Sequence, residues 1–211
     1  MSARRLGIFG GTFDPPHMGH LILAAEARDQ LNLDLTVWVL TPDPPHKQGS
    51  EIASLAHRLA MVELAIADDP GFFLSHVDID RPGPHYAVDT VRLLRQQYPG
   101  DELIYLMGGD SLQDLPRWYQ AEVFLAALDG VGVMRRPGDE IDLSELFDAL
   151  PMLRDKLNFV TAPLLEISAK QIRHRVTDHR AFRYYLPPAV YRYVLEQGLY
   201  QAQPGRESVG D

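Results

Sequence analysis

The sequence contains no cysteine, which excludes disulfide bridges, thiolate nucleophiles and the common zinc sites built from cysteine. No segment approaches the roughly 18 apolar residues of a membrane-spanning helix. The first residues lead into a strand-like segment rather than a secretory signal. We therefore expect no membrane partner and a cytoplasmic location. Neither a Walker A nor a GxGxxG sequence occurs, which argues against P-loop hydrolysis and dinucleotide redox chemistry.

Positive charge is also scarce, because 20 Lys and Arg stand against 29 Asp and Glu, for a formal net charge of -9. Proteins that bind nucleic acid along their surface need a broad basic field to displace counterions. We therefore expect no nucleic-acid partner, and an anionic ligand must be held at a local site. The sequence leaves the choice between a monomer and a homo-oligomer open.

The length suits a globular protein with one core. With 211 residues, 45% of them hydrophobic, such a chain buries about 70% of the surface that its unfolded state exposes. We expect one domain over residues 1–200 and a flexible tail over residues 201–211, where no periodic pattern remains.

Short apolar segments alternate with helical patterns along the chain. Strands are expected at 6–9, 35–41, 72–77, 103–107, 131–134 and 157–161, and helices at 19–31, 55–67, 87–97, 168–176 and 188–196. Continuous apolar strands between helices of about ten residues indicate a parallel sheet covered on both faces. The fold class is therefore α/β.

The most informative segment is the N-terminal turn, residues 10–20, with the sequence GGTFDPPHMGH. Gly10 and Gly11 allow backbone N–H groups to approach a ligand, and the following helix directs its partial positive end at the same space. His17 and His20 are three positions apart, so both can donate to one phosphoryl group. Taken singly, each histidine suits a structural role. Taken together, the eleven residues predict a phosphate-binding site. Because the histidines would act as hydrogen-bond donors, no protein nucleophile is required.

This turn resembles the GGTFDPxHxGH signature of the bacterial nicotinate mononucleotide adenylyltransferases, within the superfamily of nucleotidyltransferases that carry HxGH. The resemblance implies a Rossmann-like, doubly wound parallel sheet with C-terminal helices. It also implies that ATP is joined to nicotinate mononucleotide, giving deamido-NAD and pyrophosphate in NAD biosynthesis. Mg²⁺ would assist while held by the ATP phosphates, without direct protein ligands, and His17 and His20 would be the catalytic residues.

A second phosphate-binding segment is indicated at residues 167–173, ISAKQIR. Ser168 is a good helix N-cap, and Lys170 and Arg173 place positive charge in the first turns, where it opposes the helix dipole. Contacts with a polyphosphate would explain this, but so would an ordinary solvated helix face. The family carries ISSTxIR here, so Ala169 and Lys170 depart from it and leave one implied phosphate contact in doubt.

Two loops are candidates for binding the acceptor nucleotide. Lys47, in the segment PPHK with His46, suits either the acceptor phosphate or an exposed basic loop, and similarity to the family's PPHK loop favours the phosphate. Tyr86 and Ala87 open a helix whose first N–H groups suit a carboxylate. The family often has Thr at position 87.

Further candidates follow the strand expected at 103–107. Gly108 permits close backbone approach, and Asp110 suits either a ribose hydroxyl or the N-cap of a helix. Trp118 and Tyr119 offer a flat surface to a pyridine ring or belong to the core, and the resemblance places the nicotinate ring on Trp118. Arg136 is a candidate for a ligand contact or a surface ion pair.

These considerations give two sets of predicted ligand contacts. The predicted ATP-binding residues are Gly10, Gly11, Thr12, Phe13, Gly108, Asp110, Ser168, Lys170 and Arg173. The predicted nicotinate mononucleotide-binding residues are His46, Lys47, Tyr86, Ala87, Trp118, Tyr119 and Arg136. Asp14 stays open, because it suits both a turn-shaping role and a contact with metal-held water.

Several alternatives remain. Another HxGH adenylyltransferase would act on nicotinamide mononucleotide or on pantetheine phosphate, although Trp118 and the loop at residues 44–47 argue against the latter. A nucleotide-binding sensor without turnover is favoured by Ala169 and Lys170 and disfavoured by the intact histidine pair. A fragment of a class I aminoacyl-tRNA synthetase fits least, since the chain is short, acidic and without a KMSKS-like loop.

Overall fold

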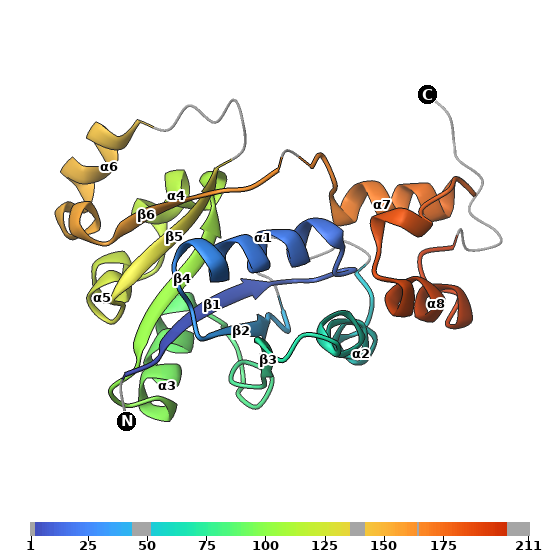
Figure 1. Cartoon of the computed structure of the whole chain (residues 1–211), viewed down its shortest axis with the longest axis horizontal. Coiled ribbons are helices and arrows are strands. Elements are labelled where there is room, and N and C mark those ends of the chain that lie inside the picture. The colour runs from blue at the N-terminus through green and yellow to red at the C-terminus, as the bar shows by residue number, and fades with distance from the viewer. Residues whose placement is uncertain (1–2, 44–51, 136–141, 164, 202–211) are drawn as a thin grey trace.

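The computed structural model of the chain describes residues 3–43, 52–135, 142–163 and 165–201, and over these residues the strands form one sheet between helices (Figure 1). The strands are β1 (Arg5–Gly11), β2 (Leu35–Leu40), β3 (Phe72–Ser75), β4 (Glu102–Gly108), β5 (Gly130–Arg135) and β6 (Leu157–Thr161). The α-helices are α1 (Met18–Gln30), α2 (Leu55–Ile66), α3 (Ala87–Gln97), α4 (Gly109–Asp114), α5 (Ala121–Ala126), α6 (Leu143–Ala149), α7 (Ala169–Thr177) and α8 (Pro188–Glu196).

The sheet of the described chain has six strands in the order β3-β2-β1-β4-β5-β6, and each neighbouring pair is parallel. The chain builds outward from β1 through β2 to β3, then crosses to β4 on the other side of β1. In such sheets, ligands bind in the crevice beyond the carboxyl ends of the strands where the direction reverses. The predicted Rossmann-like α/β fold is confirmed, and it locates this crevice between β1 and β4.

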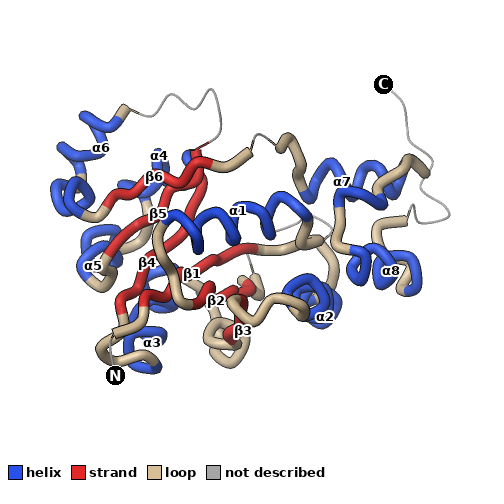
Figure 2. Tube along the Cα trace, in the orientation of Figure 1, coloured by secondary structure: helices blue, strands red, loops and turns tan. Residues whose placement is uncertain are grey.

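Successive residues of the central strands point to opposite faces of the sheet and so build two cores. Phe9 and Trp38 join the cluster under α1 and α2, whereas their neighbours Ile8 and Val37 join the cluster under α3 and α5. All four side chains are at most 5% exposed. Helices therefore cover both faces of the sheet, as Figure 2 shows with the strands in red.

The helices α7 and α8 lie beyond the sheet, next to α2 and the N-terminal end of α1 (Figure 1). Ile172 of α7 and Val190 and Val194 of α8 are at most 1% exposed and share a third apolar cluster with Met61 of α2. Pro188 occupies the first position of α8, as the sequence predicts. This cluster attaches the C-terminal helices to the side of the sheet that carries the N-terminal turn.

The sequence predictions missed α4, α5 and α6, which have only six or seven residues each. Such short helices show too few turns for a periodic pattern, and they are stabilised by single buried side chains such as Leu112, Phe124 and Leu146. The third strand also ends at Ser75, two residues earlier than predicted. Among the described helices, none is long and apolar enough to cross a membrane.

Candidate active site

The N-terminal turn begins where β1 ends at Gly11. A Cβ at Gly11 would lie only 2.8 Å from the ring of Phe13, so no larger residue fits unless that ring moves. Phe13 itself has a φ of 48°, an uncommon value for a residue with a side chain. Its ring is 3% exposed and packs against Trp38 at 5.0 Å and His20 at 5.1 Å between ring centroids. The ring of Phe13 thus packs against His20 as part of the core, and the predicted contact of Phe13 with ATP stays a prediction.

The two predicted catalytic histidines lie against each other at the start of α1. His17 is the N-cap residue, and its backbone N–H donates to Nδ1 of His20 over 3.1 Å. The two rings stack with centroids 3.7 Å apart and planes inclined by 23°. Because Nδ1 of His20 accepts this hydrogen bond, a neutral His20 carries its proton on Nε2, which is then a donor.

Gly19 leaves room for this pair of rings because it lacks a side chain. A Cβ at position 19 would lie 3.0 Å from Nδ1 and 3.1 Å from Cε1 of His17. Gly19 is buried within α1, and His17 is 6% exposed. The spacing of the HxGH segment therefore has a steric reason as well as a chemical one.

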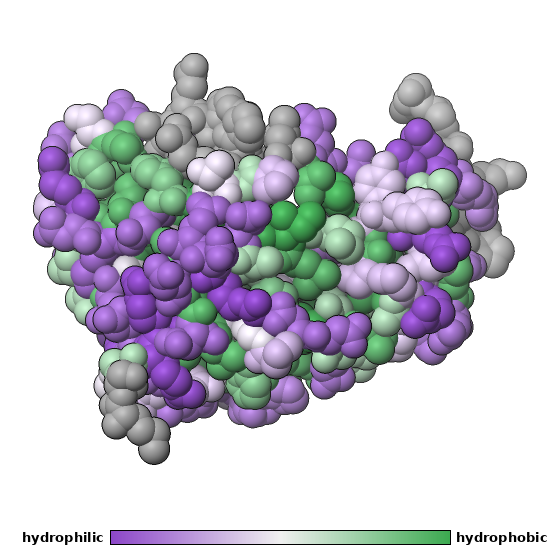
Figure 3. All heavy atoms as spheres, viewed as in Figure 1, coloured by the Kyte–Doolittle hydropathy of each residue, from purple (hydrophilic) through white to green (hydrophobic). Residues whose placement is uncertain are grey.

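A large cavity of about 280 Å³ opens beside the histidine pair, on the α1 face of the sheet. It lies at the crevice between β1 and β4, because Gly108 ends β4 and lines it together with His17 and His20. Figure 3 shows apolar residues between α1 and α7 on this face. The lining residues are His17, Gly19, His20, Ile22, Leu23, Gly108, Met134, Ala162, Pro163, Leu165, Ile167, Ser168 and Ala169.

The second predicted phosphate segment reaches the same cavity through its first residues. Ser168 is the N-cap of α7, as predicted, and its hydroxyl accepts from the backbone N–H of Gln171 over 3.2 Å. Ser168 and Ala169 line the large cavity, whereas Lys170 is exposed on α7. The start of α7 therefore joins the N-terminal turn at one site, although 148 positions separate residue 168 from residue 20.

Arg173 points elsewhere, toward the N-terminal turn itself. Its Nη1 donates to the backbone oxygen of Asp14 over 2.7 Å and lies 3.5 Å from Oδ2 of the same residue. Arg173 is not among the residues that line the large cavity. Its predicted contact with ATP stays a prediction, while its contact with the turn is a feature of the structure.

Asp14 belongs to the N-terminal turn, and the sequence leaves its role open. Its side chain points into the protein and is 1% exposed. Its Oδ1 accepts from the hydroxyl of Tyr200 over 2.7 Å and from the backbone N–H of Ala53 over 3.1 Å. Burial, aided by the negative charge of Asp14, raises the pKa of Tyr200, so its hydroxyl keeps the proton that it donates. This geometry favours the turn-shaping role of Asp14.

Arg58 of α2 contributes to the same region and was missed by the sequence analysis. It is 1% exposed, and it donates to the backbone oxygens of Thr12 at 3.1 Å, Thr41 at 2.8 Å and Pro42 at 2.6 Å. A fourth bond runs from Nε to the backbone oxygen of Ala53. The signal in the sequence was a charged residue on the apolar face of a helix, which is rare unless the charge is paired or hydrogen-bonded.

Among the described residues that were predicted to bind the acceptor, Ala87 lies on the other face of the sheet. Gly10 and Ala87 line a small cavity of about 50 Å³, at the start of α3. Gly10 was assigned to ATP, yet it lies here rather than in the large cavity, with the hydroxyl of Tyr105 3.1 Å from the position of a Cβ. The small cavity is polar, and its other lining residues are Ile8, Val39, Thr41, Asp78, His85, Thr90 and Tyr105.

The polar wall of the small cavity was not anticipated from the sequence. The hydroxyl of Thr90 donates to the carboxylate of Asp78 at 2.9 Å, and Arg81 forms an ion pair with the same carboxylate at 2.8 Å. Asp78 is only 4% exposed, and the positive charge of Arg81 compensates the negative charge of its carboxylate. Burial also raises the pKa of Tyr105, so its hydroxyl stays a neutral hydrogen-bonding group. Asp78 and Arg81 are only three positions apart, but Thr90 of α3 and Tyr105 of β4 join them only through the packing of α3 against the sheet.

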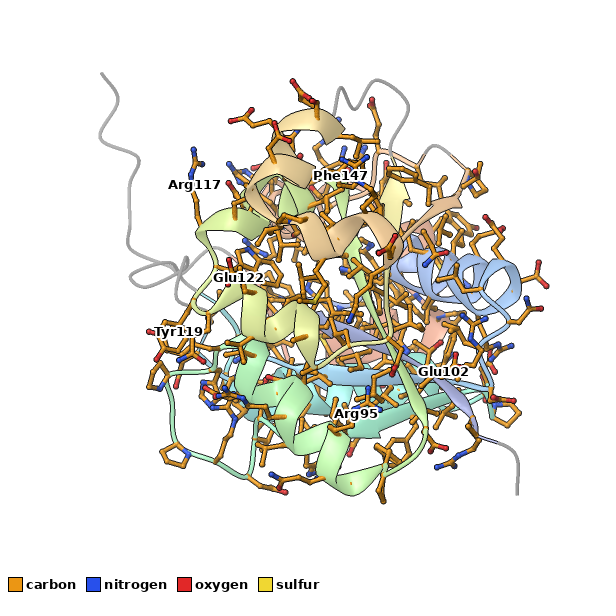
Figure 4. All side chains as sticks on the ribbon, turned by 90° about the vertical axis from the view of Figure 1, so that its left-hand side faces the viewer. Arg95, Glu102, Arg117, Tyr119, Glu122 and Phe147 are labelled. Carbon is orange, nitrogen blue, oxygen red and sulfur yellow. The ribbon has the colours of Figure 1, made fainter. Side chains whose placement is uncertain are left out.

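The predicted aromatic surface divides into two parts. Trp118 is half-buried and packs against Tyr105 and Phe124, with ring centroids 6.1 Å and 5.4 Å away. Tyr86 and Tyr119 instead stack on each other at 4.3 Å, with exposed fractions of 37% and 53%. Figure 4 shows Tyr119 at the periphery of the molecule. Trp118 therefore belongs partly to the core, and the tyrosine pair lies outside it.

Asp110 is exposed in the first turn of α4, whose N-cap is Gly108. Of the two alternatives for Asp110, the N-cap role is excluded, because β4 passes directly into α4 at Gly109, and the contact with a ribose hydroxyl stays a prediction. Three further predicted contacts, His46, Lys47 and Arg136, lie outside the described residues.

The parallel sheet carries a turn with two paired histidines at its switch point, the place between β1 and β4 where the strand order reverses. These features identify the class of the HxGH nucleotidyltransferases. Residues 8–175 match the model of the cytidylyltransferase-like family. A probable nicotinate-nucleotide adenylyltransferase of Thermomicrobium roseum is 47% identical over 93% of this chain and 92% of its own length. The nicotinate-nucleotide adenylyltransferase of Bacillus subtilis is 39% identical over 94% of this chain and 100% of its own length. The chain belongs to the cytidylyltransferase-like family and, within it, to the nicotinate-nucleotide adenylyltransferases.

A distant solved structure supports the fold. The nicotinic acid mononucleotide adenylyltransferase of Plasmodium falciparum, complexed with NaAD, superposes with a TM-score of 0.76. It is 18% identical and covers 93% of this chain and 97% of its own chain. At this identity the agreement concerns the arrangement of strands and helices.

Proposed function

We propose that this chain joins ATP to nicotinate mononucleotide by direct in-line attack of the mononucleotide phosphate on the α-phosphorus of ATP. The products are nicotinate adenine dinucleotide and pyrophosphate, which is the reaction of its family. The observation that carries the mechanism is the stacked pair His17 and His20, which lines a cavity at the switch point of the sheet. This arrangement favours catalysis over a sensor that only binds nucleotide.

The histidine pair acts on the transferring phosphoryl group. Charge accumulates on the non-bridging oxygens of phosphorus as the attacking oxygen approaches, and donors already in place stabilise that charge. The hydrogen bond from the backbone of His17 to Nδ1 of His20 keeps the imidazole of His20 oriented with Nε2 as its donor. The reaction then proceeds without a covalent intermediate on the protein.

ATP is assigned to the large cavity. Its lining combines apolar side chains of α1, namely Ile22 and Leu23, with the hydroxyl of Ser168 and the backbone of Gly108. Apolar surface suits a base, and imidazole, hydroxyl and backbone N–H groups suit phosphate oxygens. Magnesium would enter bound to ATP, because Mg²⁺ prefers oxygen ligands and the triphosphate supplies them. When bound, it neutralises the charge of the departing pyrophosphate.

Nicotinate mononucleotide is assigned to the opposite face, beside the small cavity. The first N–H groups of α3, at Ala87 and its neighbours, suit the nicotinate carboxylate because of the helix dipole. Trp118, Tyr86 and Tyr119 provide aromatic surface nearby. This assignment favours nicotinate mononucleotide over nicotinamide mononucleotide. The positive end of a helix stabilises a charged carboxylate more than a neutral amide.

The test is to incubate the protein with ATP and Mg²⁺ and either nicotinate mononucleotide or nicotinamide mononucleotide, and to measure pyrophosphate and dinucleotide. We expect efficient formation of deamido-NAD, with a larger kcat/KM for the acid. Absence of product with both mononucleotides would refute the enzymatic reading, and a preference for the amide would refute the assignment of the acceptor. Omission of Mg²⁺ should abolish turnover. A cytoplasmic location is proposed as well, and fractionation of cells that produce the chain would test it.

A further inference from the structure

A buried polar cluster lies beneath the N-terminal turn, on the side away from the ligand cavity. Its members are Asp14, Arg58, Arg173 and Tyr200, which come from the turn, from α2, from α7 and from the segment after α8. None of the four is among the residues that line the large cavity. Asp14 and Arg58 are each 1% exposed, whereas Arg173 and Tyr200 are partly buried, so the first two side chains are shielded from water.

Arg58 connects three segments that are separate in the sequence. Its guanidinium donates to the backbone oxygens of Thr12 in the turn, of Thr41 and Pro42 after β2, and of Ala53 before α2. Thr12 belongs to the segment that holds the histidine pair, whereas Thr41 also lines the small cavity. A single buried side chain thus ties the N-terminal turn after β1 to the segment after β2 and to the start of α2.

A charged side chain at this depth is costly unless its hydrogen bonds are satisfied. Burial lowers the pKa of Arg58, while the negative charge of Asp14 acts to raise it. Arginine stays protonated even so, because its ordinary pKa lies far above neutral pH. The stabilisation of this buried charge therefore depends on the turn and the other segments keeping their carbonyl groups in place.

Tyr200 holds the turn from another direction. Its hydroxyl donates to Oδ1 of Asp14 at 2.7 Å, and its backbone oxygen accepts from the hydroxyl of Thr177 at the end of α7. Asp14 precedes His17 by three positions in a turn stiffened by two prolines. A displacement of Asp14 is therefore transmitted to His17. Tyr200 lies outside residues 8–175, the part that matches the family model.

We propose that Arg58 and Tyr200 are positioning residues for adenylyl transfer, which hold the N-terminal turn through Thr12 and Asp14 so that His17 and His20 meet the transferring phosphoryl group. This proposal rests on the proposed function. It implies that the C-terminal segment after α8 is part of the catalytic apparatus rather than an appendage to the fold.

The first experiment compares Tyr200→Phe with Tyr193→Phe. The hydroxyl of Tyr193 also links the C-terminal helices to α2, since it lies 3.0 Å from Nδ1 of His57, but it does not touch the turn. Each variant loses one hydroxyl, so both melting temperatures should fall. Tyr200→Phe removes the hydrogen bond to Asp14 and a contact of 4.0 Å with the sulfur of Met61, whereas Tyr193→Phe removes the link to His57. Only Tyr200→Phe should lower kcat, by about tenfold, as expected for a lost hydrogen bond to a charged group. The KM values for both substrates should change by less than about twofold.

A double-mutant cycle then tests whether Tyr200 acts through Asp14. If it does, Asp14→Asn and Tyr200→Phe together should lower kcat by no more than about twofold beyond the worse single variant. All rates are measured at one temperature, about 20 °C below the lowest melting temperature among the variants, so that unfolded protein does not lower kcat. Multiplicative effects on kcat, or equal losses in Tyr200→Phe and Tyr193→Phe, would overturn the proposal for Tyr200. Failure of the wild-type protein to form product would overturn the proposed function instead.

Arg58→Lys tests the second residue. Lysine keeps the charge, but its compact ammonium group cannot span four carbonyl oxygens, and we expect kcat to fall by about tenfold or more. Arg95→Lys is the matched control, because Arg95 similarly bridges the backbone oxygens of Asp101 and Ala127 and the carboxylate of Asp129, at the opposite end of the sheet. An unchanged kcat in Arg58→Lys, or an equal loss in Arg95→Lys, would contradict the proposal.

Discussion

Substitution of Gly19 by alanine should separate catalysis from stability. The added Cβ would lie 3.0 Å from Nδ1 of His17, which is 0.4 Å less than the 3.4 Å at which ordinary contacts begin. The His17 ring must therefore move by about 0.4 Å, and it cannot do so alone, because it stacks on His20 at 3.7 Å. A misplacement of about 1 Å at a reacting centre costs roughly 100-fold in rate, so a shift of this size predicts a loss of about 3- to 10-fold in kcat.

The folding stability should change much less. Alanine in place of glycine stabilises a helix by about 0.5–1 kcal/mol, which offsets the tight contact with His17. The assay is steady-state release of pyrophosphate at saturating ATP and nicotinate mononucleotide, together with urea denaturation. Gly108→Ala is the control, because its Cβ meets nothing within 4 Å. It should leave the fold and kcat largely intact while raising the KM for ATP about tenfold, since the methyl group enters the ligand cavity. Wild-type kcat in Gly19→Ala would show that the position of His17 is not critical.

Three further outcomes are expected. His20→Ala should lower kcat about 100-fold with a smaller effect on ATP affinity, as loss of a transition-state donor does; equal losses in ground-state binding would indicate an anchoring role. Ser168→Ala should lower the free energy of unfolding by about 1 kcal/mol in urea denaturation, because the N-cap bond to Gln171 is lost; unchanged stability would contradict this capping role. The hydrogen bond from Arg4 holds the pKa of Asp101 below its ordinary value, so its stabilising effect is present above about pH 4 and lost as the pH falls further. The difference in melting temperature between wild type and Asp101→Asn should therefore hold from neutral pH downward and close below about pH 4; a constant difference would refute it.

The strands and long helices could be predicted from the sequence because each produces a periodic signal. The apolar run that ends at Gly10 and Gly11 and the helical pattern after Gly19 match β1 and α1 to within one or two residues. The turn between them could be recognised because its chemistry is local, with two histidines and three glycines inside eleven positions. The ligand contacts assigned to individual residues stay predictions.

What the sequence did not reveal depends on contacts between distant residues. Arg58 and Tyr200 reach the turn from 46 and 186 positions away, measured from Thr12 and Asp14. The small cavity likewise combines Asp78, Thr90 and Tyr105, whose proximity follows from strand order and helix packing. A sequence shows which side chains are unusual for their surroundings, but their partners emerge only when the sheet order is known.

The switch point has a consequence for how such an enzyme changes its acceptor. The large cavity draws its lining from the α1 face, whereas the small cavity, which includes Gly10, draws on the α3 face. The two sets of lining residues do not overlap. Under the proposed assignment of ATP to the large cavity and of the mononucleotide to the small one, mutations on the α3 side would alter which mononucleotide is accepted and leave the contacts with ATP unchanged. One nucleotide-handling half can in this way serve many different acceptors over evolutionary time.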